Sequence, residues 1–373
     1  MRHRYIRGAV LAVVVAAVWP GGAGAQEGGF QPPVNSGDRL PIPTGRSGSP
    51  GFYFGAEFVM LMQTRAIGNQ DIAFRGFYDT QGFLSGVPGT FIGSGVSALN
   101  TRTGGQRSFS PGFRAEIGYK FDTGTRIYAN YLQLYDARYS NGATPFLLGQ
   151  KARIDLADTF VTSPVYNHPV SFTGPINDTS ADPGTAGGGN TAGIWNAADE
   201  MNLRFTQRYQ QIDVGARIPL FATEHSTVYG LSGGRFAWFF ERFTWRTVDL
   251  DSGSNPAPQN TAIYSNTLSQ RMYGLFVGCG HEVYLGNMFS ASLDLTGAAY
   301  MDVVKGRSKY KLGDLSTQSK DGRDTFTIVP SGTAEFNLWM YPTEGVQFRI
   351  GYSALTFFNT RYMRHPVGFN FQN

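Results

Sequence analysis

The stretch Phe-Ser-Ala-Ser-Leu-Asp-Leu-Thr-Gly-Ala-Ala-Tyr-Met-Asp, residues 289–302, alternates between two kinds of side chain almost without fault. Leu293 and Leu295 fall on one face, whereas Ser292 and Asp294 fall on the other. A period of two residues predicts a β-strand. An apolar face that contacts lipid and a polar face that contacts water are typical of strands in a transmembrane β-barrel.

The same alternation recurs along the chain and predicts nine strands. They lie near residues 52–62, 113–121, 126–135, 211–218, 227–245, 273–280, 289–302, 333–340 and 347–353. A bacterial barrel with both ends in the periplasm needs an even number of strands. We therefore predict an all-β, antiparallel up-and-down transmembrane barrel of about ten strands, with the tenth strand after Asn359. Twelve strands is the alternative, if residues 64–107 supply a hairpin.

The connections between these strands alternate in length. Short turns are predicted near residues 122–124, 219–226, 286–288 and 342–345, and long polar segments near 64–107, 140–201, 249–268 and 305–324. Short periplasmic turns and long extracellular loops are the usual asymmetry of outer-membrane barrels. The segment 140–201 is the candidate for a constriction or lid.

The N-terminus has the three parts of a secretory signal peptide. Arg2, Arg4 and Arg7 precede a short apolar run at residues 8–18, and Ala23-Gly24-Ala25 forms an A-x-A cleavage site. We therefore expect residues 1–25 to be removed after Ala25, and localisation in the bacterial outer membrane. The Gly-, Pro- and Ser-rich residues 26–50 are expected to be a disordered periplasmic leader, and residues 51–373 the barrel domain.

Composition agrees with a barrel and argues against nucleic acid as a partner. Charged residues make up 16% of the chain, whereas soluble proteins carry about 25%. Without the three signal arginines, 28 of the 31 basic residues remain against 27 acidic ones, a net charge of +1. Cys279 is the single cysteine, so no intramolecular disulfide can form. A large secreted β-sandwich shares part of this composition and is the alternative class.

Several short strings resemble a family of β-barrel porins in planctomycete-type bacteria. They are Gly51-Phe52-Tyr53-Phe54-Gly55-Ala56-Glu57, Pro111-Gly112-Phe113-Arg114-Ala115-Glu116 and Phe357-Phe358-Asn359-Thr360-Arg361-Tyr362-Met363. The likeness covers most of the chain after the signal. It implies an outer-membrane location and a pore, and it supplies no catalytic residues. The chain departs from the usual terminal aromatic of such barrels, because it ends in Phe371-Gln372-Asn373.

One hydrolase motif is present, but its context is wrong. Residues 230–234, Gly-Leu-Ser-Gly-Gly, match G-x-S-x-G around Ser232. That motif requires a strand, a sharp turn and a helix, whereas here it lies inside a predicted strand. The histidines are scattered, and no metal-ligand spacing appears. We expect no enzyme activity, metal or cofactor, and an outer-membrane hydrolase is the weakest alternative.

Charged residues of both signs fall on the predicted inward face. They are Glu57, Arg114, Glu116, Lys120, Asp213, Arg217, Arg235, Glu241, Asp294, Glu335 and Arg349. In an open pore they would line the water path and tune ion selectivity. In a narrow barrel they would pair across the lumen and close it, and their charge balance favours pairing. Aromatic residues near strand ends, among them Trp238, Trp245 and Trp339, are expected at the membrane interfaces.

The sequence thus predicts an outer-membrane barrel that acts as a pore for passive diffusion of small hydrophilic solutes or ions. A non-conducting structural or adhesive barrel is the alternative. The expected partners are outer-membrane lipid, small solutes or ions and the barrel assembly machinery, and homo-oligomerisation is left open.

Overall fold

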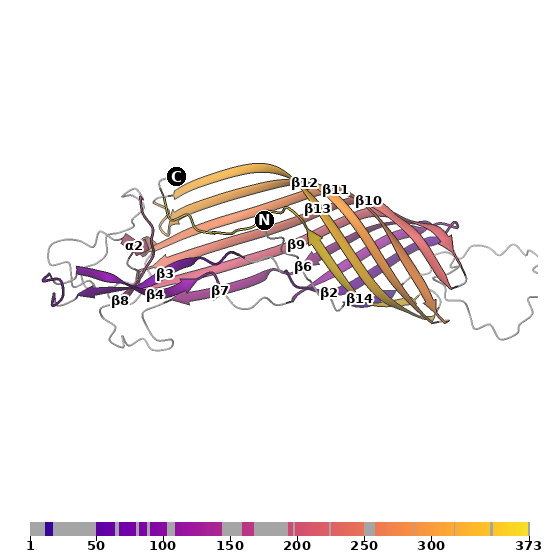
Figure 1. Ribbon diagram of the computed structural model, residues 1–373, viewed down its shortest axis with the longest axis horizontal. Coiled ribbons are helices and arrows are strands. Elements are labelled where there is room, and N and C mark those ends of the chain that lie inside the picture. Colours follow the sequence, from indigo (N-terminus) through magenta and orange to yellow (C-terminus); the bar gives the residue numbers. More distant parts are fainter. Residues whose placement is uncertain are drawn as a thin grey trace, which may run out of the picture.

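The computed structural model describes residues 12–17, 50–63, 67–79, 82–87, 90–102, 109–143, 159–167, 193–196, 198–223, 225–249, 258–286, 288–316, 318–343 and 346–371. These residues form an all-β fold whose main sheet is antiparallel and strongly curled into a barrel-like shape (Figure 1). Among them, no helix is long and apolar enough to cross a membrane.

Two sheets contain all the named strands. The main sheet consists of β1 (Ala12–Ala17), β2 (Gly51–Leu61), β5 (Ser110–Lys120), β6 (Arg126–Leu134), β7 (Ala137–Ala143), β9 (Glu200–Ala222), β10 (Ser226–Val248), β11 (Thr261–Leu285), β12 (Phe289–Leu312), β13 (Gln318–Thr343) and β14 (Val346–Phe357). The small sheet consists of β3 (Asp71–Asp79), β4 (Thr90–Asn100) and β8 (Thr159–Thr162). The short helix α2 (Gly193–Asn196) and the 3₁₀ turn η2 (Pro258–Asn260) complete the described elements.

The strand pairings of the main sheet run in a closed ring. Each strand from β9 to β14 pairs with the next, β2 pairs with β5, β5 with β6, and β6 with β9. Strands β2 and β14 run in the same direction, and β1 lies between them, antiparallel to both. The tenth strand of the ring therefore lies within residues 1–25, the predicted signal peptide. Most of the predicted leader, residues 26–49, lies outside the described residues.

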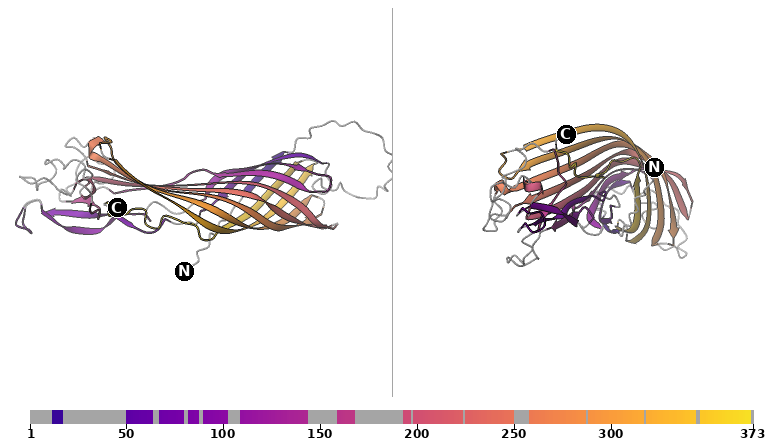
Figure 2. Two further views of the ribbon diagram at one scale, coloured as in Figure 1. Left: turned by 90° about the horizontal axis from the view of Figure 1, so that it is seen from above. Right: turned by 60° about the vertical axis from the view of Figure 1, so that its left-hand side comes forward.

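The strands fall into two length classes, and this difference shapes the molecule. Strands β2, β5, β6 and β14 have 9 to 12 residues, whereas β9 to β13 have 23 to 26. At about 3.3 Å per residue, the long strands span roughly 75–85 Å. The strands therefore form a ring only over the height of the short strands. Beyond that height, β9–β13 continue as a curved wall (Figures 1 and 2). We call this part the extension.

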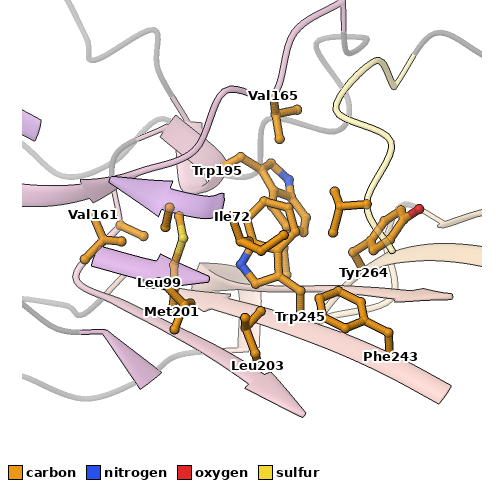
Figure 3. Close-up of a cluster of buried hydrophobic side chains, with 14 of the residues drawn as sticks. Ile72, Leu99, Val161, Val165, Trp195, Met201, Leu203, Phe243, Trp245 and Tyr264 are labelled. Atoms are coloured by element: carbon orange, nitrogen blue, oxygen red, sulfur yellow. The ribbon is translucent and has the colours of Figure 1, made fainter. Parts of the chain in front are cut away.

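A hydrophobic cluster fills the concave side of the extension. Trp195 of α2 packs edge-on against Trp245 of β10, with ring centroids 4.5 Å apart, and its indole N–H donates to the Tyr310 hydroxyl at 3.2 Å. Ile72 and Leu99 of the small sheet join this cluster and are fully buried (Figure 3). The small sheet and α2 are thus held on the wall by a common core.

Two of the predicted long loops, 249–268 and 305–324, contain long stretches of strand. Residues 261–268 belong to β11, 305–312 to β12 and 318–324 to β13. Residues 64–107 do contain a hairpin, β3–β4, but it pairs with β8 in the small sheet and not in the ring. The predicted loop 140–201 contains the end of β7, β8, α2 and the start of β9; residues 144–158, 168–192 and 197 of it lie outside the described residues.

The C-terminal segment does not form the predicted tenth strand. It runs over the concave side of the extension, where two side-chain amides bind its backbone. Gln270 donates to the Arg361 carbonyl at 3.0 Å and accepts from its N–H at 3.1 Å, and Gln70 binds both backbone groups of Val367 in the same way. Pro366 has no N–H to offer a strand ladder, so amide side chains replace the neighbouring strand.

Replacing Gln270 by alanine is expected to release this tail. The side chain is fully buried, and loss of its two hydrogen bonds leaves backbone groups unpaired, at roughly 1–3 kcal/mol per buried group. Trypsin should then cut faster after Arg361 and Arg364. Gln318→Ala, at an exposed position at the start of β13, should leave the cleavage rate unchanged. Equal rates in both variants would contradict the role assigned to Gln270.

Candidate functional site

The two faces of the ring differ sharply in exposure. Leu275, Val277, Leu293 and Leu295 point outward and are 46–74% exposed. The residues between them in sequence point inward. On the inward face of the neighbouring strands β9 and β10, Asp213 and Arg235 are only 3% and 8% exposed. An outward apolar surface around a charged interior reverses the arrangement of a soluble protein. The interior is therefore where a functional site has to be sought.

The first interior ion cluster crosses the barrel. Arg114 of β5 lies 3.0 Å from Glu335 of β13 and 3.7 Å from Glu57 of β2. Glu57 also pairs with Arg349 of β14. Because β14, β1 and β2 separate β13 from β5 in the ring, the contact between Arg114 and Glu335 spans the interior and does not follow the wall.

The second cluster contains the most buried ion pair among the described residues. The Arg235 Nε lies 2.7 Å from the Asp213 carboxylate, and these side chains are 7% and 5% exposed. Gln211 donates to the same carboxylate at 2.9 Å, and Arg235 also donates to Thr333 of β13 at 3.3 Å. The Arg235 guanidinium lies 4.7 Å from the centre of the Phe276 ring. Every charged group of this cluster thus has a partner in place of water.

The third cluster lies closer to the short turns. Arg217 pairs with Glu282 at 3.1 Å, and its guanidinium lies 3.3 Å from the centre of the Tyr229 ring. The Tyr229 hydroxyl donates to Asp294, which lies two strands away. Glu282 also accepts hydrogen bonds from Ser290 at 2.7 Å and Tyr341 at 3.0 Å.

An apolar cluster closes the interior on the side of the extension. Tyr209, Phe239, Met272, Tyr300 and Val329 are buried together from five strands of the ring. Phe357 at the end of β14 completes the packing, with its ring centre 5.0 Å from that of Phe239. The interior thus changes from charged to apolar along its length, and side chains occupy both parts.

The structure places all eleven predicted charged residues on inward positions and brings eight of them into the three clusters. Of the other three, Glu116 forms a hydrogen bond with Tyr53, Glu241 accepts one from Gln207 at 3.4 Å, and Lys120 is half-buried at the end of β5. The alternation in the sequence did not single out three residues of the third cluster, Glu282, Tyr229 and Tyr341. The same alternation predicts an inward position for Glu282, because it follows Gly278 and Gly280 at two-residue spacing on the inward face of β11.

The aromatic residues expected at the interfaces divide into two groups. Trp238 lies outward, with its N–H donating to Ser269 at 2.9 Å. Trp339 points inward and donates to Ser292 at 3.0 Å, and Trp245 is fully buried in the extension. The interfacial assignment is therefore wrong for Trp245 and Trp339. Trp339 alternates onto the inward face of the ring, and Trp245 alternates onto the concave side of the extension.

Within the part of the chain that the structure describes, the hydrolase motif lies in an unbroken strand. Ser232 lies in the middle of β10, opposite Val277 of β11, and points outward. His281 of β11 is also exposed but lies opposite Val228. No family model matches the chain, and no curated protein matches it.

Proposed function

We propose that this protein is a β-barrel of the bacterial outer membrane whose interior is closed, and that it anchors the extension at the cell surface without conducting solutes. The outward apolar band and the strand lengths support the membrane location. A transmembrane strand needs about 9–11 residues, and β2, β5, β6 and β14 have 9 to 12. The predicted export signal and the resemblance to planctomycete-type porins agree with this location.

One observation supports the closed state above all others, namely the ion pair between Arg114 and Glu335 across the interior. Barrels of about eight strands are filled by side chains, whereas barrels of 16–18 strands leave an aqueous channel. Nine strands of the ring lie outside the predicted signal peptide and the tenth, β1, lies within it, so the ring is near the small end of that range. The Arg235–Asp213 ion pair and the packing of Phe239 against Phe357 fill other heights of the interior. We therefore prefer the non-conducting barrel to the open pore.

Conductance in a planar bilayer tests this proposal. Protein purified from the membranes of an expressing host should give no discrete current steps. Insertion can be verified with Cys279, which lies on the outward apolar face. It should resist a water-soluble maleimide in the bilayer and react after denaturation.

A triple variant serves as the positive control for an open interior. Arg114→Ala combined with Phe239→Ala and Phe357→Ala removes the crossing ion pair and much of the apolar cluster, and should produce current steps if the variant inserts. Reproducible, ion-selective steps from the unaltered protein would overturn the closed state and restore the diffusion pore. Rapid labelling of Cys279 in folded protein would overturn the membrane location.

A further inference from the structure

The outward face of β9–β13 changes character where these strands enter the extension. In the ring, one row across the strands contains Ile212, Phe236, Tyr273, Met301 and Ile328. Two rows further along, Arg208, Phe240, Ser269, Lys305 and Asp324 lie side by side. Apolar side chains thus give way to basic ones within two rows.

Most of the charged residues of this row and the next three are basic. Across the four rows, nine outward positions are basic and one, Asp324, is acidic. The nine are Arg204, Arg208, Arg242, Arg246, Lys305, Arg307, Lys309, Lys311 and Lys320. We call this set the basic face.

The ion pairs of the basic face leave most of its charge uncompensated. Arg208 binds Asp136 at 2.7 Å, and Lys305 lies 3.6 Å from Asp324. Within the described part of the chain, the other seven basic residues make no ion pair. Arg204, Arg242, Arg307, Lys309 and Lys320 are exposed. A surface of this kind attracts a polyanion.

The aromatic boundary below the basic face fixes its position relative to a bilayer. The Arg208 guanidinium lies 5.8 Å from the ring centres of both Trp238 and Phe240, and that of Arg242 lies 5.2 Å from Phe240. Outward aromatic residues mark the membrane–water interface, so the basic face begins at the level of lipid phosphates. Guanidinium groups bind phosphate oxygens with paired, directed hydrogen bonds.

The height of the basic face indicates the kind of headgroup. Four rows span roughly 20 Å along the strands, or about 15 Å along the membrane normal at a tilt near 40°. The headgroup layer of a phospholipid is only about 5–8 Å thick. A headgroup that carries phosphates on a saccharide would reach all four rows.

We propose that the basic face binds the phosphorylated saccharide headgroups of glycolipids in the leaflet at the extension end of the barrel. This inference rests on the proposed membrane location. The short turns lie at the other end of the barrel and are periplasmic in such proteins, so the leaflet is the outer one. The lipid contacts the apolar band with its acyl chains and the basic face with its headgroup.

Quenching of Trp238 by brominated lipid tests this binding. Trp238 points outward, whereas Trp195 and Trp245 are buried and Trp339 points inward, and a Trp238→Phe reference isolates its signal. The protein is reconstituted with phosphatidylcholine brominated on its acyl chains, and unlabelled competitor lipid is added. Diphosphoryl lipid A should relieve the quenching at a mole fraction at least fivefold lower than unlabelled phosphatidylcholine does. Added salt should reduce this preference.

Matched variants assign the preference to the basic face. Neutralising Arg242, Arg307, Lys309 and Lys320 together to glutamine should reduce the fivefold preference to about one. Neutralising the exposed Arg361 and Arg364, which lie on the C-terminal segment, should preserve it. A preference that survives the fourfold change would overturn the proposal, as would phosphatidylglycerol competing as well as lipid A.

The same measurement separates this inference from the proposed function. If Trp238 of folded protein is not quenched by brominated lipid at all, the membrane location is wrong and both proposals fail. If Trp238 is quenched but the unaltered protein has no headgroup preference, the barrel remains in the membrane and only the lipid site is refuted.

Discussion

Arg235→Met is expected to lower the free energy of unfolding by about 3–5 kcal/mol, because it leaves the Asp213 carboxylate buried without its cation. The pair is almost entirely removed from solvent, and its Nε–Oδ1 distance is 2.7 Å. The remaining Gln211 hydrogen bond cannot balance a full charge in a low-dielectric interior. Urea titration of the reconstituted protein, followed by tryptophan fluorescence, measures the loss.

Two further variants test the origin of this effect. Arg235→Met combined with Asp213→Leu removes both charges and should cost less than the single change. Lys305→Met breaks the exposed ion pair with Asp324, whose side chains are 35% and 54% accessible. That change should cost at most about 1 kcal/mol. A loss for Arg235→Met as small as that for Lys305→Met would mean that water reaches the interior pair.

Leu293→Arg is expected to destabilise the protein in a bilayer by roughly 2–4 kcal/mol, the usual cost of arginine near the midplane of a lipid-facing strand. Leu293 is 46% exposed on the outward face of β12 and lies opposite His281 and Phe336 on the adjoining strands. Folding into vesicles, measured as a function of urea, reports the change.

Thr267→Arg is the matched control, because Thr267 lies on the outward face of β11 opposite Arg307, within the basic face. It should cost less than Leu293→Arg, since an arginine there meets water or headgroups, where salt screens its repulsion from Arg242 and Arg307 on the adjoining strands. Tolerance of Leu293→Arg together with failure of Asp294→Leu to assemble would reverse the assignment of the two faces.

Alternation in the sequence correctly predicted the faces of the ring. Leu293 is exposed and Arg235 is buried, as their parity indicates. The reason is physical, since the outward face contacts one medium and the inward face another along the whole height of the ring. The polarity of each residue in the ring therefore indicates which face of the strand it occupies.

The same assignment of faces failed in the extension, because there the apolar residues point inward and the polar residues point outward. On β12, Lys305, Arg307 and Lys309 point outward while Val304 and Tyr310 are buried on the concave side. Alternation persists, but the polar residues are now on the outside. The segment therefore resembled a polar loop when it was compared with a lipid-facing strand. The point where the two faces exchange polarity is also where the outward face becomes basic.

The sequence by itself determined the all-β class, the alternation of faces and the inward position of the charged residues, because these depend on the two-residue period of a strand. Only the tertiary structure decided which charges pair, since Arg114 and Glu335 are 221 residues apart and meet across the ring. It also decided that the C-terminal segment packs on the extension and that β1 lies between β2 and β14. These outcomes depend on long-range packing and on the direction of distant strands, which no local pattern records.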